Sequence, residues 1–144
     1  MVKELGLIEK LKSKGHRITR IRENLILVFS KSTQPLSIPE INLAVQNNEL
    51  NPNKSTLYRE IDFLKSQKII KELDFGENKK RYELISSSPK NHLVCLKCKK
   101  IFDFQANFNL EKEDKRVYKQ TGFKIIRYSL ELFGLCINCQ DFNS

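Results

Sequence analysis

In the first half of the chain, apolar residues recur every three or four positions, which is the spacing of amphipathic helices. Four helices are predicted. The first ends at Gly15, the second begins after a Thr19 cap, and the third begins after Ser37, which opens a capping box. The fourth runs from Lys54 to about Gln67. The apolar residues expected to pack inward are Leu7, Ile8, Leu11, Ile21, Leu25, Ile26, Phe29, Ile41, Ala44, Val45, Leu57, Ile61 and Leu64.

Two short alternating runs follow the fourth helix, at 69–75 and 79–84, around a Gly76-Glu77-Asn78 turn. Such a pair of runs predicts a β-hairpin. Helices followed by a hairpin are the order of a winged helix-turn-helix, in which the last helix reads the major groove and the hairpin is the wing. We therefore expect residues 1–85 to form a winged-helix DNA-binding domain.

The pattern changes after a polar, proline-containing stretch at 86–91, which is predicted to be a hinge. The runs beyond it indicate a small α/β unit over 92–144, so the fold class of the whole chain is α+β. The expected elements are strands at 92–95, 100–104 and 123–133, and a helix at 110–121 that ends at Gly122.

All four cysteines of the chain lie in two C-x-x-C pairs, Cys95 with Cys98 and Cys136 with Cys139. Zn²⁺ prefers four tetrahedral ligands, and a tight turn with cysteines three apart presents two sulfurs to one ion. Four protein ligands leave no open position, so this pattern predicts a closed, structural zinc site. Reduced cysteines in a core, or a redox dithiol, are the alternatives.

The 144 residues carry 26 Lys and Arg against 17 Asp and Glu, a net charge of +9. This excess favours a polyanion partner, nucleic acid before an anionic membrane, with a merely basic surface as the alternative. The first residues lack the apolar run of a signal peptide, and no apolar stretch reaches the length of about 18 residues that spans a bilayer. These features predict a cytoplasmic protein with reduced thiols and no membrane partner.

Basic residues gather in and around the predicted reading helix, at 10–22, at 54–59 and in the wing at 79–81. The start of the helix, at 54–59, combines short polar side chains with free N–H groups that suit phosphate. Arg59 can donate to the major-groove edge of guanine, and Tyr58 can pack on a thymine methyl group. A solvated helix face is the alternative, which the two flanking basic segments disfavour.

Several motifs follow one another over nearly the whole chain: Gly15-His16-Arg17-Ile18-Thr19, Ser55-Thr56-Leu57-Tyr58-Arg59, Phe75-Gly76-Glu77, Arg81-Tyr82-Glu83-Leu84, His92-Leu93-Val94-Cys95-x-x-Cys98 and Leu132-Phe133-Gly134-Leu135-Cys136. Together they resemble the ferric uptake regulator (Fur) family of metal-dependent transcription factors. The resemblance implies a homodimer, in which the winged helix binds an AT-rich palindromic operator and the C-terminal domain dimerises and binds metal.

The resemblance also implies roles for single residues. Tyr58 and Arg59 match major-groove contacts, Arg17 matches a basic residue that can enter the minor groove, and Arg22 matches an arginine that opens the second helix. A narrow AT-rich minor groove attracts arginine by its negative potential. The DNA-binding residues expected are Arg17, Arg22, Lys54, Ser55, Thr56, Tyr58 and Arg59.

The family's sensing site needs a histidine-rich segment before the first C-x-x-C, and this chain has two histidines in all. His92 remains in that segment, and Glu83 and Asp103 match carboxylate positions of the family. Three ligands are few for Fe²⁺, Mn²⁺ or Zn²⁺, and Lys90 beside them opposes a cation. We therefore expect Glu83, His92 and Asp103 to be the remnant of a regulatory metal site, reduced or remodelled, and DNA binding to proceed without added metal.

The resulting hypothesis is a sequence-specific transcriptional regulator, a repressor of metal-homeostasis or oxidative-stress genes, and not an enzyme. A zinc enzyme would need an open ligand position or an H-E-x-x-H motif, which the sequence lacks. The alternative is a zinc-ribbon module that binds nucleic acid or a protein without sensing metal. That alternative leaves the reading helix and the wing without a purpose.

Overall fold

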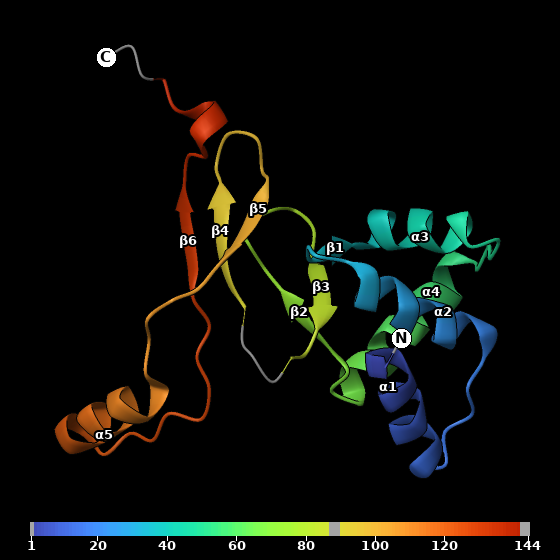
Figure 1. Cartoon of the computed structure of the whole chain (residues 1–144), viewed down its shortest axis with the longest axis horizontal. Coiled ribbons are helices and arrows are strands. Elements are labelled where there is room, and N and C mark those ends of the chain that lie inside the picture. The colour runs from blue at the N-terminus through green and yellow to red at the C-terminus, as the bar shows by residue number, and fades with distance from the viewer. Residues whose placement is uncertain (1, 87–89, 142–144) are drawn as a thin grey trace. The chain divides into compact units, whose positions relative to one another are not determined.

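The computed structural model describes residues 2–86 and 90–141 (Figure 1). The chain divides into two compact units, Met1–Ser87 and Ser88–Ser144. Part of the predicted hinge at 86–91 lies outside the described residues. None of the helices in the described ranges combines the length and the apolar character needed to cross a bilayer.

The first unit begins with helices, most of which start at a residue whose side chain caps the first turn. They are α1 (Val2–Ser13), α2 (Arg20–Lys31), α3 (Ile38–Asn47) and α4 (Lys54–Ser66). The Thr19 hydroxyl accepts the N–H of Arg22 at 3.2 Å, as predicted from the sequence. Ser37 and Glu40 form the predicted capping box. After α1, Gly15 takes a positive φ of 81°, where a side chain would be strained.

A three-stranded antiparallel sheet completes the first unit. Its order is β1 (Leu36–Ser37), β3 (Arg81–Leu84) and β2 (Ile70–Leu73). The β2–β3 pair is the predicted hairpin, with Ile70 opposite Leu84. Strand β1 was not predicted, because two residues are too short to show an alternating pattern. The sheet and helices together give the element order of a winged helix-turn-helix.

The core of the first unit lies between the helices and the sheet. All thirteen apolar residues expected to pack inward do so; most are fully buried, and Leu7, Ile21 and Ala44 are partly buried against the cluster. The sequence periodicity therefore identified the buried faces of the four helices correctly.

The second unit is a small mixed sheet with one helix. Strand β4 (Asn91–Cys95) lies in the middle, antiparallel to β5 (Ile101–Phe104) and parallel to β6 (Glu131–Gly134). Helix α5 (Leu110–Thr121) joins β5 to β6 and ends at Gly122, whose φ is 73°. A short 3₁₀ turn, η1 (Ile137–Cys139), follows β6.

The long strand predicted at 123–133 is wrong, since only its end, β6, forms a strand. Its alternating apolar residues fit a strand, but a strand also needs a neighbour with free N–H and C=O groups. The ladder with β4 begins with His92 opposite Glu131 and ends with Cys95 opposite Gly134. Residues 123–130 precede that ladder and run as irregular chain from α5 to β6 (Figure 1).

Candidate metal centre and DNA-reading surface

The four cysteines come together in the second unit although 37 residues separate the two pairs in sequence. Cys95 ends β4, Cys98 follows it in a tight turn, and Cys136 and Cys139 lie at the start and end of the η1 turn. Each turn is closed by a backbone hydrogen bond: Lys99 N–H donates to the Cys95 carbonyl at 2.9 Å, and Cys139 N–H to the Cys136 carbonyl at 2.9 Å. Each turn therefore directs both sulfurs of its pair toward the same point.

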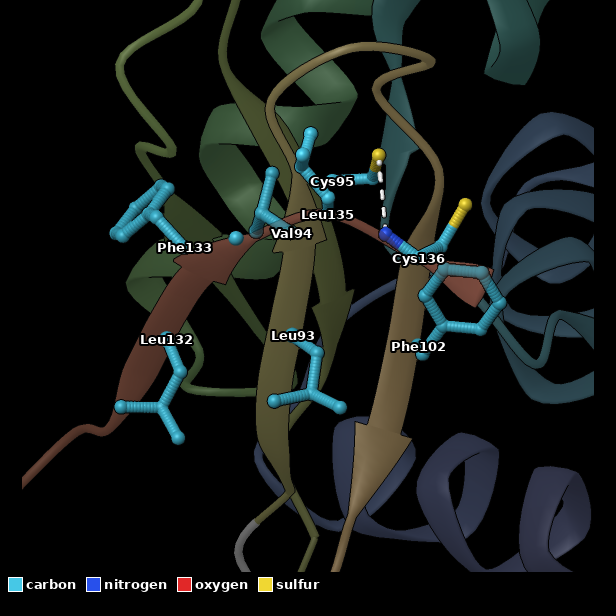
Figure 2. A pocket seen from close by; sticks show the side chains of 9 residues that line it. Leu93, Val94, Cys95, Phe102, Leu132, Phe133, Leu135 and Cys136 are labelled. Atoms are coloured by element: carbon cyan, nitrogen blue, oxygen red, sulfur yellow. Dashed lines mark hydrogen bonds between the residues drawn. The ribbon is translucent and has the colours of Figure 1, made fainter. Parts of the chain in front are cut away.

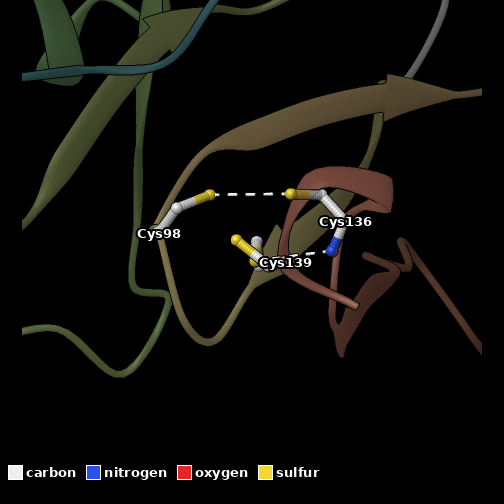
Figure 3. Close-up of side chains that lie close together, drawn as sticks. Cys98, Cys136 and Cys139 are labelled. Carbon is white, nitrogen blue, oxygen red and sulfur yellow. Dashed lines mark hydrogen bonds between the residues drawn. The ribbon is translucent and has the colours of Figure 1, made fainter. Parts of the chain in front are cut away.

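The geometry of the sulfurs suits one zinc ion. All four Sγ atoms lie within 4.8 Å of one another, and Cys98 Sγ is 3.7 Å from Cys136 Sγ (Figure 3). A tetrahedron with Zn–S bonds of about 2.3 Å has S–S edges of about 3.8 Å. The sulfur cluster therefore fits the ion that the sequence pattern predicted. Within the described part of either unit, no other group of three or more His, Cys, Asp or Glu side chains meets this test.

Electrostatics inside the cluster also favour a dication. The backbone N–H groups of Cys136 and Cys98 lower the pKa of the Cys95 thiol to about 6, and Cys136 N–H lies 3.4 Å from Cys95 Sγ. The neighbouring thiols, Cys136 first, raise the pKa of Cys139 to about 12. One thiolate therefore forms readily. The Cys139 thiol resists ionisation because its S–H donates to the neighbouring sulfurs, and their negative charge opposes a further thiolate beside them. A bound Zn²⁺ would compensate four thiolates together.

The predicted remnant of a regulatory site is divided between the two units. His92 on β4 faces Asp103 on β5, with Nδ1 3.0 Å from Oδ1, and His92 is only 1% exposed. The Lys90 ammonium lies 3.9 Å from the other oxygen of Asp103. Glu83 belongs to the first unit, where its Oε1 is 3.3 Å from the Lys71 ammonium. The structure thus pairs two of the three predicted ligands with each other and places a cation beside each carboxylate.

Helix α4 presents the predicted reading face to solvent. Its inner side is buried, and its first turn is capped by Asn53, whose side chain accepts the Thr56 N–H at 2.8 Å. Lys54, Tyr58 and Arg59 are exposed, with the Lys54 ammonium 5.9 Å from the centre of the Tyr58 ring. Exposed Ser55 and half-buried Thr56 complete the predicted reading face of α4.

Arg22 occupies a different place from the other expected DNA-binding residues. Its Nε and Nη2 donate to the two carboxylate oxygens of Glu60 on α4, at 2.8 and 3.1 Å. Its Nη1 donates to the backbone carbonyl of Arg17 at 2.6 Å. Arg17 itself carries an exposed side chain. In this conformation three of the five N–H donors of Arg22 bond within the protein.

Glu60 is a residue that the sequence reasoning missed. It lies three positions after Leu57 and four before Leu64, so it falls within the apolar stripe of α4. A carboxylate at such a position requires a buried cation, because an unpaired buried charge is very costly. A glutamate within the apolar stripe was therefore the sequence feature that pointed to a buried ion pair, and Arg22 is its partner.

The basic side chains of the wing (79–81) are less available for phosphate contacts than the sequence suggested, because carboxylates pair with two of them. Lys80 lies 2.8 Å from Asp74 in the same hairpin. Arg81 is nearly buried and bonds to Glu77 at 3.1 Å and to Glu40 of α3 at 3.0 Å. Two of the three basic wing residues, Lys80 and Arg81, are therefore paired with carboxylates.

These features define a class of protein that joins a unit with the element order of a winged helix to a second unit with a thiolate metal site. The model of the ferric uptake regulator family matches residues 13–133, and the chain belongs to that family. It is 29% identical to the ferric uptake regulation protein of Helicobacter pylori strain ATCC 700392 / 26695 over 131 residues, 91% of this chain and 87% of that protein. It is 30% identical to the peroxide-responsive repressor PerR of Staphylococcus aureus strain USA300 over 135 residues, 93% of this chain and 89% of that protein.

Solved structures give the same result. The H. pylori ferric uptake regulator, described as having three functional metal binding sites, matches with a TM-score of 0.79 at 28% identity, covering 99% of this chain and 95% of that one. A zinc-bound manganese uptake regulator matches with a TM-score of 0.68 at 25% identity, covering 91% of this chain and 98% of that one. These relatives are transcription regulators, and members of the family bind DNA and act as dimers.

Proposed function

We propose that this protein is a sequence-specific repressor that binds an AT-rich palindromic operator as a homodimer and controls genes of metal homeostasis or oxidative stress. The observation that carries the proposal is the first half of α4, which is capped, basic and exposed on one face and buried on the other. As a DNA-binding regulator with reduced thiols, the protein would act in the cytoplasm.

The reading face offers distinct chemistry for phosphates and for bases. The N-terminal N–H groups of α4, with Lys54, Ser55 and Thr56, suit phosphate oxygens. Arg59 can donate two hydrogen bonds to guanine, and Tyr58, 40% exposed, can cover a thymine methyl group. Arg17, on the basic loop before α2, would enter an adjacent narrow minor groove.

An uncovered apolar face in the second unit supports dimerisation. Leu93 of β4, Phe102 of β5 and Leu132 of β6 are exposed opposite one another on one face of the sheet, and together with Phe133 and Leu135 they line a shallow hollow of about 170 Å³ (Figure 2). Monomeric proteins seldom leave so many large apolar side chains together in water. A second copy of this unit would bury them, and it would bring two winged helices to the two halves of a palindrome.

We further propose that DNA binding needs the structural zinc but no added regulatory metal. The His92 ring is already hydrogen-bonded to the Asp103 carboxylate. The Lys90 ammonium lies beside the same carboxylate, where a regulatory cation would have to bind. An ammonium beside Asp103 raises the electrostatic cost of bringing a dication to the same oxygen atoms. A weak second site for Fe²⁺, Mn²⁺ or Zn²⁺ is the competing outcome.

Selection of duplexes from a random-sequence pool, followed by gel shifts over a range of salt concentrations, tests the DNA-binding proposal. We expect an AT-rich palindrome to be enriched and log Kobs to fall linearly with log salt, with a slope of about −0.9 for each phosphate contacted. Arg59→Ala should weaken binding about tenfold or more, the value of one good base contact. Lys31→Ala, which removes an exposed charge from the far end of α2, is the matched control and should leave binding nearly unchanged. Tighter binding to single-stranded RNA than to any duplex would instead support a zinc-ribbon module.

A further inference from the structure

Arg22 and Glu60 form a tightly organised link between the start of α2 and the middle of α4. The bidentate pair has N–O distances of 2.8 and 3.1 Å, and the side chains are only 12% and 11% exposed. A planar guanidinium and a planar carboxylate joined in this way fix both distance and orientation. The link therefore sets how α4 lies against α2.

The same guanidinium also holds the basic loop. Its third donor bonds to the backbone carbonyl of Arg17 at 2.6 Å, directly at the residue whose side chain is proposed for the minor groove. The guanidinium carbon lies 3.6 Å from the centre of the Phe63 ring on α4, and the centroids of the Phe63 and His16 rings lie 5.0 Å apart with the rings nearly perpendicular. Phe63 is thus contacted both by Arg22 and by the loop residue His16.

The arrangement joins two elements that must reach DNA together. Tyr58 and Arg59 precede Glu60 directly on α4, and Arg17 is fixed through its own carbonyl. A shift of either element by a fraction of an ångström would break a bidentate contact with a base. The charge of Arg22 is meanwhile balanced by Glu60, so it adds little net attraction for phosphate.

We infer that Arg22 is a positioning residue, which with Glu60 fixes the spacing between the minor-groove loop at Arg17 and the reading face of α4, and is not itself a DNA contact. This inference rests on the proposed DNA-binding function. It assigns to Glu60, an acidic residue in a DNA-reading helix, a role that favours DNA binding.

The test compares Glu60→Gln and Arg22→Lys with the wild-type protein on the selected operator and on random duplex. Glu60→Gln removes a negative charge, so a simple charge effect would tighten binding. We expect instead that both variants lose about tenfold in operator affinity, the value of one well-placed base contact, while affinity for random duplex and the salt slope stay nearly unchanged. Arg20→Lys, an exposed change two residues from Arg22, is the matched control and should keep operator affinity.

A double-mutant cycle with Arg17→Ala distinguishes a role of Arg22 in positioning the loop from a role only in the stability of the fold. Arg17→Ala should cost clearly less in the Arg22→Lys background than in the wild type, because the loop is already released. Affinities are measured on the folded fraction, monitored by circular dichroism well below the unfolding midpoint. Additive effects, unchanged or tighter operator binding by Glu60→Gln, or a lower melting temperature with normal operator affinity would each overturn the inference. If the wild-type protein selects no duplex, the proposed function fails and this inference fails with it.

Discussion

Replacing Cys98 with serine should remove the zinc ion and unfold the second unit while the first unit stays folded. Cys98 contributes one corner of the sulfur tetrahedron, 3.7 Å from Cys136 Sγ. The three remaining thiolates would need water as a fourth ligand, which weakens a structural site. The consequence follows from how little else holds this unit together.

The second unit has a very small core. Among its described residues, only Val94, Cys95 and Ile101 are buried apolar side chains, and α5 buries none. Full burial of an aliphatic side chain contributes about 1.5–3 kcal/mol, so Val94 and Ile101 together provide roughly 3–6 kcal/mol. Structural zinc supplies about 10–16 kcal/mol in comparable thiolate sites, and its loss would therefore exceed everything the small core provides.

Hydrogen exchange resolved by segment is the suitable assay, together with zinc content after mild chelation. In the Cys98→Ser protein we expect amide protection to be lost in β4, β5 and β6 and kept in the helices of the first unit. Lys97→Ser introduces the same residue at the adjacent exposed position and is the matched control, expected to retain zinc and protection. Wild-type protection in a Cys98→Ser protein shown to lack zinc would refute the reasoning, because the sheet would then be stable without the metal.

Three further predictions concern single groups. Ile61→Ala, which empties a buried position of α4, should lower the free energy of unfolding by about 2–5 kcal/mol in urea titrations, with no change in zinc content. Partial burial raises the pKa of Glu40, but hydrogen bonds from Ser37 and the charge of Arg81 outweigh it and lower that pKa below its ordinary 4.5. The ionised Glu40 carboxylate therefore stabilises the fold at neutral pH, and this stabilisation is lost on acidification. Glu40→Gln should therefore cost about 1 kcal/mol at neutral pH and almost nothing in acid, as thermal melts at both pH values would show. Zinc affinity, measured by competition with an indicator, should fall as the pH is lowered and should fall more steeply below about 6, the pKa of the Cys95 thiol, because below that pH this thiol must also release a proton when zinc binds; a flat profile would contradict this.

Local signals in the sequence were enough to predict the elements of the first unit. The caps at Thr19 and Ser37 depend only on neighbouring residues, and the helical stripes show which faces are buried. The sulfur cluster was also predictable, since cysteines in two C-x-x-C pairs have few other uses in a reduced chain. In these cases the chemistry is carried by residues close together in sequence.

The features that were missed depend on partners distant in sequence. Residues 123–130 have the composition of a strand, but the ladder with β4 starts only at Glu131. Arg22 was expected to bind DNA because it matches a family arginine, and its bonds to Glu60, 38 residues away, are a tertiary feature that no local pattern reveals. The pairing of Lys80 with Asp74 likewise removes basic charge from the wing that the sequence had suggested.

Under the proposed function, this Fur-family protein binds its operator with structural zinc alone. The most direct test measures operator affinity of protein carrying about one zinc per chain, in a mild chelator that removes weakly bound metal but leaves the cysteine site loaded. The same measurement is repeated after adding Fe²⁺ or Mn²⁺ in excess of the chelator. We expect equal operator affinity in all conditions, and binding that occurs only after a divalent metal is added would show that the protein needs a regulatory metal.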